Sequence, residues 1–473
     1  MKKVAFHNLG CKVNSYEIDG IMQMFQKRGY KIVDFAQKSD IYVINTCTVT
    51  NIADRKSRQM IHRAKAQNPE AVVVATGCYV QTDTDGAVND ECIDIAVGNN
   101  HKAEIVDIVE KYLEREEDRS SDNPGNVKDV WDKKTFGRTT VSDLTRPVEY
   151  ENISIDSTAE HTRAFIKIQD GCNQFCSYCA IPLARGRVRS RNPEDIISEV
   201  FRLAGKGYKE VVLTGIHLSS YGLDENYNSF AARGKTNTKL LDVIENVNGI
   251  EGIERIRLGS LEPRLLTEEF TASLSKISKL CPHFHLSLQS GCDEVLKRMN
   301  RHYDTKEFKE KVRLLRRYFD HPAVTTDIIV GFPGESDEEF EITRQYLEEI
   351  NLYECHIFKY SRRSGTVADK MQCQMPDAVK QARSRILIED SQRRERDYAK
   401  YYCGKKVSVL LEDTENHEGE IFWVGYTPEY VKCCIKSSSD ENLSGKSVQG
   451  YAKKYDAGVM YVDSCVFGDN AIE

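Results

Sequence analysis

The N-terminal part of the chain alternates short apolar runs with amphipathic stretches. Ile18, Ile21, Met22 and Phe25 fall on one face of a helix, and Gly29 follows as its expected end. The apolar runs have the length and composition of buried parallel strands, at residues 3–6, 41–44, 71–74 and 93–97, with a polar helical stretch at 54–67. This alternation predicts a parallel α/β domain over residues 1–114.

Residues 115–156 lack apolar periodicity and contain the sequence Ser-Ser-Asp-Asn-Pro-Gly, so we expect a linker there. Beyond it the alternation returns. The expected strands are 165–168, 211–214, 256–258, 284–288, 324–330 and 356–358. One helix between them is well marked, with Asn192 as its cap and Pro193 at its first position. Six repeats predict a partial (β/α)6 barrel over residues 157–400.

The pattern changes again near the C-terminus. A charged helical stretch at 377–401 ends at Cys403 and Gly404, and alternating strands such as 407–411 and 459–462 follow. Residues 401–473 are therefore expected to form a small all-β barrel. The predicted fold class is α/β multidomain, with this barrel as its third part.

Composition excludes a membrane protein. Of the 473 residues 40% are hydrophobic and 29% are charged, and no apolar run approaches the roughly 20 residues of a membrane span. The first residues form no apolar signal core, so we expect a cytoplasmic location. The net charge of −7 gives no general attraction to nucleic acid, and any RNA contact has to come from local basic patches.

The 15 cysteines are an odd number in a chain with no export signal, which favours metal binding or catalysis over disulfides. Cys172, Cys176 and Cys179 form a C-x-x-x-C-x-x-C motif after the first expected strand of the central part. Three thiolates on one short loop can hold three irons of a [4Fe–4S] cube and leave the fourth open for S-adenosylmethionine (SAM). The alternatives are a zinc site or an electron-carrier cluster, but both need a fourth ligand and the loop contains none.

A second set of cysteines is spread along the N-terminal part. Cys11, Cys47 and Cys78 each follow an expected strand within a few residues. In a parallel sheet these positions share the carboxyl edge, where ligand sites collect, so the three could hold a second cluster. The alternative for each one taken alone is a small buried core residue.

At these cysteines the chain resembles the radical SAM methylthiotransferases, over nearly its whole length. The resemblance rests on both triads in order, on Asp170-Gly171-Cys172 through Ala180-Ile181-Pro182, and on a C-terminal barrel of the TRAM type. Asn-Leu-Gly-Cys-Lys-Val-Asn-Ser-Tyr-Glu at 8–17 is similar to the branch that acts on N6-threonylcarbamoyladenosine next to the anticodon. The isopentenyladenosine branch tends to have Gly-Cys-Gln-Met-Asn there, and the ribosomal-protein branch Gly-Cys-Pro-Lys-Asn.

The resemblance implies two [4Fe–4S] clusters and SAM as both radical source and methyl donor. It implies that SAM cleavage occurs at the Cys172 cluster, that hydrogen is removed from C2 of the adenine, and that the sulfur comes from the Cys11 cluster. The implied partners are the anticodon stem-loop of tRNA and a reductant such as flavodoxin or ferredoxin. The oligomeric state does not follow from the sequence.

Other residues are candidates for SAM contact, most of them at the ends of expected strands: Tyr178, Thr214, Gly215, Ser260, Glu262, Gln289 and Asp327. A glycine at a strand end lets the backbone approach a ligand closely, and a carboxylate can hold the amino group or the ribose hydroxyls of SAM. For Glu262 the alternative is a surface or helix-cap role. Gln289 and Asp327 are placed near SAM by the resemblance.

The candidates for RNA contact are Arg185, Arg187, Arg189, Arg191, Trp423 and Lys432. The arginines suit the tRNA backbone or the carboxylate of the modified base, with a solvated basic loop as the alternative. Aromatic and basic residues on a small barrel can stack bases and follow phosphates. The alternative for the aromatic rings is that they fill the barrel interior.

Three other functions are weighed against methylthiolation of N6-threonylcarbamoyladenosine in tRNA, which the resemblance implies. Two share its chemistry: methylthiolation of isopentenyladenosine in tRNA, and methylthiolation of an aspartate in a ribosomal protein. The third is a non-enzymatic, metal-containing RNA-binding protein with the C-terminal barrel as its working part. Iron content and SAM cleavage separate this last function from the enzymes.

Overall fold

The structure is a computed structural model that describes residues 1–120, 139–146, 148–158, 162–224, 238–417, 419–436 and 442–467. The chain divides into two compact units. Unit 1 comprises Met1–Ser157, Gln169–Arg191 and Ser361–Asp369, and unit 2 comprises Thr158–Ile168, Asn192–Tyr360 and Lys370–Glu473. All six cysteines of the two triads therefore belong to unit 1.

Unit 1 is built on a parallel sheet with the strand order β2-β1-β3-β4-β5-β6. The strands are β1 (Lys3–Asn8), β2 (Lys31–Val33), β3 (Ile41–Thr46), β4 (Val72–Gly77), β5 (Ile95–Val97) and β6 (Thr139–Thr140). The helices of the N-terminal part are α1 (Lys12–Lys27), α2 (Asn51–Gln67), α3 (Cys78–Thr82), α4 (Thr84–Asn89), the short 3-10 helix η1 (Lys102–Glu104) and α5 (Ile105–Ser120). The predicted parallel α/β fold is confirmed.

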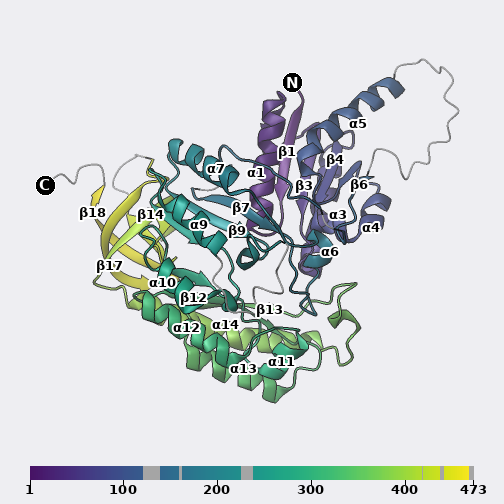
Figure 1. Cartoon of the computed structure of the whole chain (residues 1–473). Helices are drawn as coiled ribbons and strands as arrows, with labels where there is room; N and C mark the ends of the chain where they lie inside the picture. The colour runs from purple at the N-terminus through teal and green to yellow at the C-terminus, as the bar shows by residue number, and fades with distance from the viewer. Residues whose placement is uncertain are drawn as a thin grey trace. The chain divides into compact units, whose positions relative to one another are not determined.

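Helices cover both faces of this sheet (Figure 1). On one face α1 and α5 pack apolar side chains such as Ile21 and Val109 against Val43 and Val74. On the other face α2, α3 and α4 pack against alternate residues of the same strands. The strands are therefore buried on both sides, which explains why they appear in the sequence as continuous apolar runs.

The central part contains six strands in the order β7-β9-β10-β11-β12-β13, joined between β10 and β11 by isolated bridges. They are β7 (Ala164–Asp170), β9 (Glu210–Gly215), β10 (Arg255–Leu258), β11 (His283–His285), β12 (Ala323–Val330) and β13 (Glu354–Lys359), and the short β8 (Arg189–Ser190) pairs antiparallel with β7. All six strands expected from the sequence are present. This order is that of a partial barrel.

Helices alternate with these strands. They are α6 (Ile181–Arg185), α7 (Pro193–Gly205), η2 (Leu218–Ser220), α9 (Thr238–Asn248), η3 (Pro263–Leu265), α10 (Glu268–Leu274), α11 (Asp293–Arg298), α12 (Thr305–Tyr318), α13 (Asp337–Ile350), η4 (Ala368–Lys370) and α14 (Asp377–Lys400). In α7 the side chain of Asn192 accepts a hydrogen bond from the backbone N–H of Glu194 at 2.9 Å, so the predicted cap is present.

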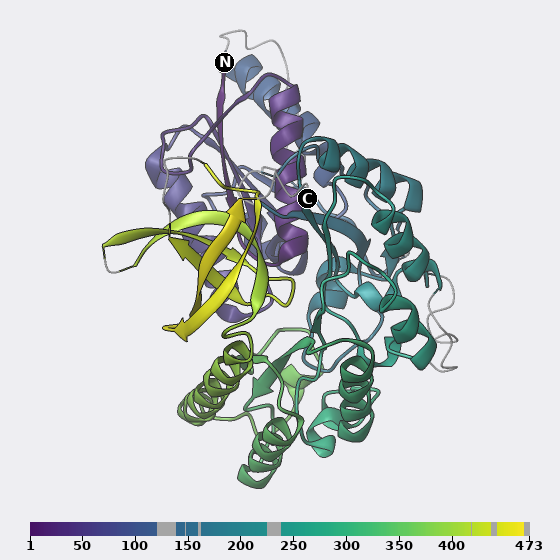
Figure 2. The same ribbon diagram turned by 90° about the vertical axis from the view of Figure 1, so that its left-hand side faces the viewer.

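The C-terminal part of unit 2 is a closed barrel with the strand order β14-β15-β16-β18-β17, coloured yellow-green to yellow in Figure 2. Its strands are β14 (Lys406–His417), β15 (Glu420–Tyr426), β16 (Lys432–Lys436), β17 (Ser447–Asp456) and β18 (Val459–Phe467). The core of the barrel continues into Ala399 and Tyr402 at the end of α14. Among the described residues, no helix has both the length and the hydrophobicity needed to cross a lipid bilayer.

Candidate functional site

The first cysteine triad lies at the carboxyl edge of the sheet in unit 1. Cys11 is the N-cap of α1, Cys47 follows β3, and Cys78 begins α3 directly after β4. Burial raises the pKa of the Cys47 thiol to about 11, and the nearby thiols of Cys78 and Cys11 add to this rise. The three thiols therefore lie in one region of the sheet edge, as the strand order predicts. Binding of a cluster requires them to lose their protons, so it depends on pH.

Backbone contacts fix the loops that carry this triad. The side-chain amide of Asn14 donates to the carbonyls of Leu9 at 2.9 Å and Thr46 at 3.1 Å. Gly77, just before Cys78, has φ +99°, and a Cβ there would lie 2.6 Å from the carbonyl oxygen of Thr46. Only glycine fits this position without strain.

The second triad lies on the loop after β7. Cys172, Cys176 and Cys179 are each partly exposed. The backbone N–H of Gln174 points to the sulfur of Cys172 at 3.4 Å, and the N–H of Cys179 donates to the carbonyl of Cys176 at 3.0 Å. The loop begins at Gly171, which has φ +70° and would bring a Cβ within 1.9 Å of the carbonyl oxygen of Arg187. A tight loop with an N–H directed at sulfur suits thiolates that hold a cluster.

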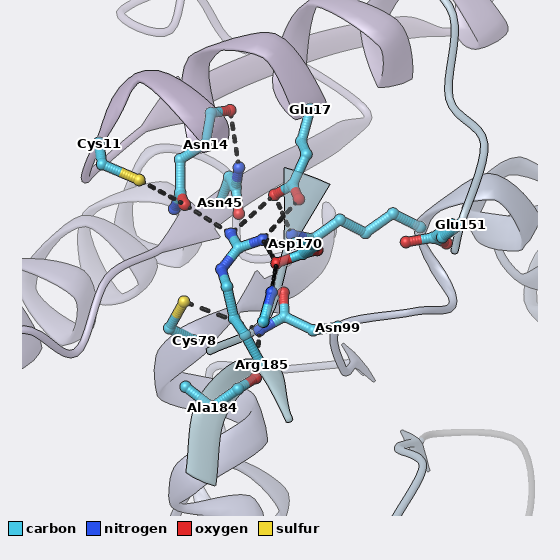
Figure 3. A network of polar contacts seen from close by, with 12 residues as sticks. Cys11, Asn14, Glu17, Asn45, Cys78, Asn99, Glu151, Asp170, Ala184 and Arg185 are labelled. Carbon is cyan, nitrogen blue, oxygen red and sulfur yellow. Dashed lines mark hydrogen bonds and ion pairs between the residues drawn. The ribbon is translucent and has the colours of Figure 1, made fainter. Parts of the chain in front are cut away.

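Arg185, at the end of α6, contacts both α1, whose N-cap is Cys11, and Asp170, which ends β7 before the loop of the second triad (Figure 3). Its guanidinium group donates to Glu17 at 2.7 and 3.0 Å, to Asp170 at 3.2 Å and to Asn14 at 2.8 Å. Lys102 also forms a buried ion pair with Glu17. Burial alone would lower the pKa of Arg185, but Glu17 and Asp170 raise it well above its ordinary value. Arg185 is therefore a permanent buried cation.

Asn99 adds a contact between α6 and the surroundings of Cys78. Its side-chain amide donates to the carbonyl of Ala184 at 2.7 Å and points to the sulfur of Cys78 at 3.7 Å. Ala184 precedes Arg185 in α6, so this short helix has two connections to the surroundings of the first triad.

Arg363 holds the loop after Cys47 from another segment of unit 1. It donates to Thr48 at 2.5 Å, to Asn51 at 2.7 Å and to Asp54 at 2.6 Å. Neither this role of Arg363 nor the pairing of Arg185 with Glu17 was predicted from the sequence. The basic pair Arg362-Arg363 after β13 is only a weak sign of a structural role in the sequence, because such pairs are usually solvated.

The expected role of three arginines in RNA contact is corrected by their burial. Arg185, Arg189 and Arg191 are at most 5% exposed. Arg189 pairs with Asp170 at 3.4 Å, and Arg191 donates to the hydroxyl of Tyr16 at 3.0 Å. Protein groups accept hydrogen bonds from terminal nitrogens of each of these guanidinium groups, so the arginines stabilise the interior of unit 1.

Arg187 differs from the other three arginines, because its side chain is exposed. Its guanidinium carbon lies 4.5 Å from the ring centre of Phe175. It stays a candidate for RNA contact.

Trp423 is 8% exposed and belongs to the barrel core, which is the alternative weighed for it. Its indole ring is therefore not available to stack on a base. Lys432 is partly exposed and forms an ion pair with Glu415 at 2.8 Å.

Of the residues expected to contact SAM, Tyr178 lies in unit 1 and the others lie in unit 2. Thr214 and Gly215 end β9, and Ser260 and Glu262 follow β10. Glu262 is buried and pairs with Arg301 at 2.8 Å, and His217 lies 3.7 Å from it. Burial opposes ionisation of this carboxyl, but Arg301 and His217 hold the pKa of Glu262 below its ordinary value. A carboxylate has about four acceptor positions, so these contacts leave room for a ligand.

Gln289 and Asp327 lie on neighbouring segments of unit 2. Gln289 has φ +73°, and its N–H donates to the carbonyl of Asp327 at 2.9 Å. A left-handed backbone is uncommon for a residue other than glycine and is often found at functional sites. His285 lies 3.3 Å from the Asp327 carboxylate and stacks on His356 with 5.6 Å between ring centres. The sequence analysis did not single out His356.

The chain matches two protein families. Residues 166–347 match the Radical SAM superfamily. Residues 3–98 match a family described as Uncharacterized protein family UPF0004. Membership of the Radical SAM superfamily implies SAM and a [4Fe–4S] cluster, and the residues that fit this cluster are the three cysteines of the loop after β7.

Comparison with curated proteins extends this similarity to nearly the whole chain. The Threonylcarbamoyladenosine tRNA methylthiotransferase MtaB of Bacillus subtilis is 40% identical over 95% of this chain and 93% of the relative. The tRNA-2-methylthio-N(6)-dimethylallyladenosine synthase of Clostridium botulinum is 33% identical over 86% of each chain.

A solved structure shares the fold. The radical S-adenosylmethionine methyltransferase TsrM from Kitasatospora setae has a TM-score of 0.53 at 17% identity and covers 78% of this chain and 77% of that chain. At this identity the likeness concerns the fold alone. The similarity over nearly the full length of the curated relatives identifies this chain as a member of the radical SAM methylthiotransferase family.

Proposed function

We propose that this protein adds a methylthio group to C2 of N6-threonylcarbamoyladenosine next to the anticodon of tRNA, with two [4Fe–4S] clusters and SAM. The observation that carries the proposal is the presence of two cysteine triads in one compact unit. One triad is on a single loop and the other is at the carboxyl edge of a parallel sheet. When bound, SAM and a cluster with an open iron supply a radical that can remove hydrogen, and a second cluster can supply sulfur.

The residues of the chain have distinct parts in this proposal. Cys172, Cys176 and Cys179 hold the cluster that binds SAM. Cys11, Cys47 and Cys78 hold the second cluster, and Asn14 fixes two of the loops that carry them. Glu262 is a proposed contact of SAM, since Arg301 keeps it ionised to accept hydrogen bonds from an amino group or ribose hydroxyls.

The substrate assignment is supported by the names of the relatives. Relatives named threonylcarbamoyladenosine tRNA methylthiotransferases from Bacillus subtilis and Aquifex aeolicus are 40% and 41% identical to this chain. Relatives from Clostridium botulinum named for dimethylallyladenosine are 33% identical. Dimethylallyladenosine is therefore the second candidate substrate. The proposed partners are the anticodon stem-loop and a small reductant protein of the flavodoxin or ferredoxin type.

Mass spectrometry of tRNA nucleosides tests chemistry and substrate together. A strain without this chain is expected to lose the 2-methylthio group from N6-threonylcarbamoyladenosine, and the wild-type gene restores it. Genes that encode C176A or C47A are expected not to restore it, although both chains accumulate. Loss of the group from dimethylallyladenosine alone would favour the second candidate. Intact modification of both nucleosides would overturn the proposal.

Iron content tests the two clusters separately. Protein purified without oxygen is expected to contain about eight irons per chain, and C176A or C47A about four. Cleavage of SAM to 5′-deoxyadenosine under reducing conditions distinguishes the enzyme from a non-catalytic RNA-binding protein. Zinc in place of iron, with no SAM cleavage, would contradict the proposal.

A further inference from the structure

We propose that Arg185 is a positioning residue for the first triad, formed by Cys11, Cys47 and Cys78, and that its Nε–H is a hydrogen-bond donor reserved for the group these thiols bind. The inference rests on the proposed function for the second cluster. It goes beyond that function by assigning to one buried side chain the control of the charge and hydrogen bonding of the cluster.

The hydrogen bonds of Arg185 to other side chains use two of its three side-chain nitrogens. Its side chain is fully buried, and both terminal nitrogens donate to Glu17, Asp170 and Asn14. Its Nε is also buried and has no hydrogen-bond partner among the described residues. A buried donor without a partner is destabilising, and more so if it is charged. The Nε atoms of Arg189, Arg363 and Arg394 are likewise buried without a partner among the described residues, so the place of Arg185 beside the cysteines, and not the missing partner alone, points to a ligand.

The guanidinium group of Arg185 has two edges with different surroundings. Figure 3 shows the guanidinium group between the carboxylates and the cysteines, with the terminal nitrogens turned to Glu17 and Asp170. The Nε edge is on the side of Cys11 and Cys78. The side-chain oxygen of Asn14 accepts from Arg185 at 2.8 Å and also lies 3.7 Å from the sulfur of Cys11. One amide group therefore joins Arg185 to the first triad.

Contacts on Arg185 and on its neighbour Ala184 hold the side chain in place. Asn14 accepts from Arg185 at 2.8 Å and donates to the backbone next to Cys47, and Asn99 connects Ala184 with Cys78. The same α6 follows directly on the loop of the second triad. An arginine fixed in this way cannot follow a change of charge at the triad by moving, so its effect is preorganised.

The expected consequence concerns the reduction potential of the first-triad cluster. A positive charge and a hydrogen bond to sulfur stabilise the reduced, more negative state and so raise the potential. A purely structural arginine, present only to neutralise Glu17 and Asp170, would leave the potential unchanged once the fold is intact. The potential therefore separates the two roles.

The experiment uses the full chain with C172A, C176A and C179A, so that any cluster signal comes from the first triad. In this background R185K keeps a charge for Glu17 and Asp170 but has no Nε–H. R257K is the matched control, since Arg257 is an equally buried arginine of unit 2 and pairs with Glu210 at 2.8 Å. Each variant is assayed for iron, for circular dichroism and for reduction by EPR-monitored titration.

The expected result is that R185K retains iron but is harder to reduce. At the midpoint potential of the parent, its ratio of reduced to oxidised cluster falls about tenfold, which corresponds to about 59 mV for one electron. R257K keeps the midpoint of the parent. If R185K does not fold, R185Q is used, because Glu17 keeps Lys102 and Asp170 keeps Arg189 as counter-charges. Loss of one positive charge and of the Nε–H is expected to lower the midpoint in the same direction.

Two failures are distinguishable. If the parent with only the first triad binds no iron, the two-cluster proposal is overturned, and the role of Arg185 with it. If the parent binds iron and both Arg185 variants fold with an unchanged midpoint, the role of Arg185 alone is overturned. Loss of iron from a folded R185K chain, with R257K unaffected, supports positioning.

Discussion

Arg363 shows how a single residue can hold a cysteine loop in place. Its guanidinium group donates to Thr48, Asn51 and Asp54, and the pair with Asp54 is 2.6 Å long and largely buried. The neighbouring Arg362 is exposed and pairs with Asp369 at 2.7 Å. Substitution of each of these adjacent arginines in turn therefore compares the contribution of a buried ion pair with that of an exposed one.

We expect R363M to destabilise unit 1 and to weaken iron binding at the first triad. Loss of one partner from a buried ion pair costs about 3–5 kcal/mol, whereas an exposed pair contributes less than about 1 kcal/mol. Urea unfolding and iron content after desalting measure the two effects. R362A is the control and should resemble the wild type. Equal effects of the two substitutions would contradict the role given to Arg363.

At the residue scale, the two cysteine triads could be singled out from the sequence, but the polar residues that form hydrogen bonds around them could not. Cys172, Cys176 and Cys179 stand out because their spacing is local. Arg185 also stood out, but as a contact for RNA, since clusters of arginines are usually solvated. Its partners Glu17 and Asp170 come from distant parts of the sequence, and only the fold brings them together.

At the element scale, the long buried strands were predictable from composition, and the shortest ones were not. The continuous apolar runs of β3 and β4 mark them as parallel strands. By contrast β2 has three residues and β6 two, too few for a periodic signal, and β6 lies inside the expected linker. The last helix of the N-terminal part, α5, continues to Ser120, inside the expected linker, because charged residues can extend a helix beyond its apolar face.

A buried ion pair joins two neighbouring strands of unit 2. Glu210 on β9 pairs with Arg257 on β10 at 2.8 Å, and both side chains are fully enclosed. Burial raises the pKa of Glu210, but Arg257 outweighs this effect and holds the pKa of Glu210 below its ordinary value. A carboxyl with a lowered pKa stabilises the fold above its unfolded pKa, ~4.3, and this contribution is lost as pH falls through the folded pKa.

We therefore expect E210Q to be less stable than the wild type at pH 7, by about 3 kcal/mol, because Arg257 loses its counter-charge. The difference should shrink as pH falls below ~4.3, since the wild type then loses the same interaction. Urea unfolding of the metal-free chain at a series of pH values measures this. E420Q is the control, because Glu420 is an exposed partner of Lys436. A pH-independent difference would contradict the explanation.

At the scale of the whole chain, unit 2 joins two regions of different sequence pattern. The barrel core includes Ala399 and Tyr402 from the end of α14. Arg255 donates to the carbonyl of Tyr426 at 2.8 Å, and Arg257 to that of Pro428 at 2.9 Å. Periodicity suggests a boundary at residue 400, but side chains on both sides of it share one core.

We expect a chain truncated after Cys403 to fold poorly. Removal of the barrel exposes apolar residues of α14 and leaves the donors of Arg255 and Arg257 without their carbonyl partners. Soluble yield, circular dichroism and limited proteolysis check this. K453A in the intact chain is a control for change on the barrel surface, since Lys453 and Asp463 are both exposed. A truncated chain that melts cooperatively at the wild-type temperature would contradict the prediction.

The net charge of −7 and the pairing of barrel lysines limit how this protein can attract tRNA. Lys432, Lys436 and Lys453 each form an ion pair with an acidic residue of the barrel. Arg187, in contrast, is exposed and lies against the ring of Phe175, which is 43% exposed. Phosphate contact by an arginine on an aromatic ring suits this arrangement.

We expect R187A to weaken tRNA binding and to reduce its dependence on salt. Each phosphate contact that is lost lowers the slope of log K against log salt by about 0.7 to 0.9. Fluorescence anisotropy with labelled tRNA at several KCl concentrations measures the slope. R28A is the control, because Arg28 is exposed but already paired with Asp107 and Glu110. If R187A keeps the wild-type slope, Arg187 makes no phosphate contact and the attraction has to come from cations that leave their acidic partners when tRNA binds.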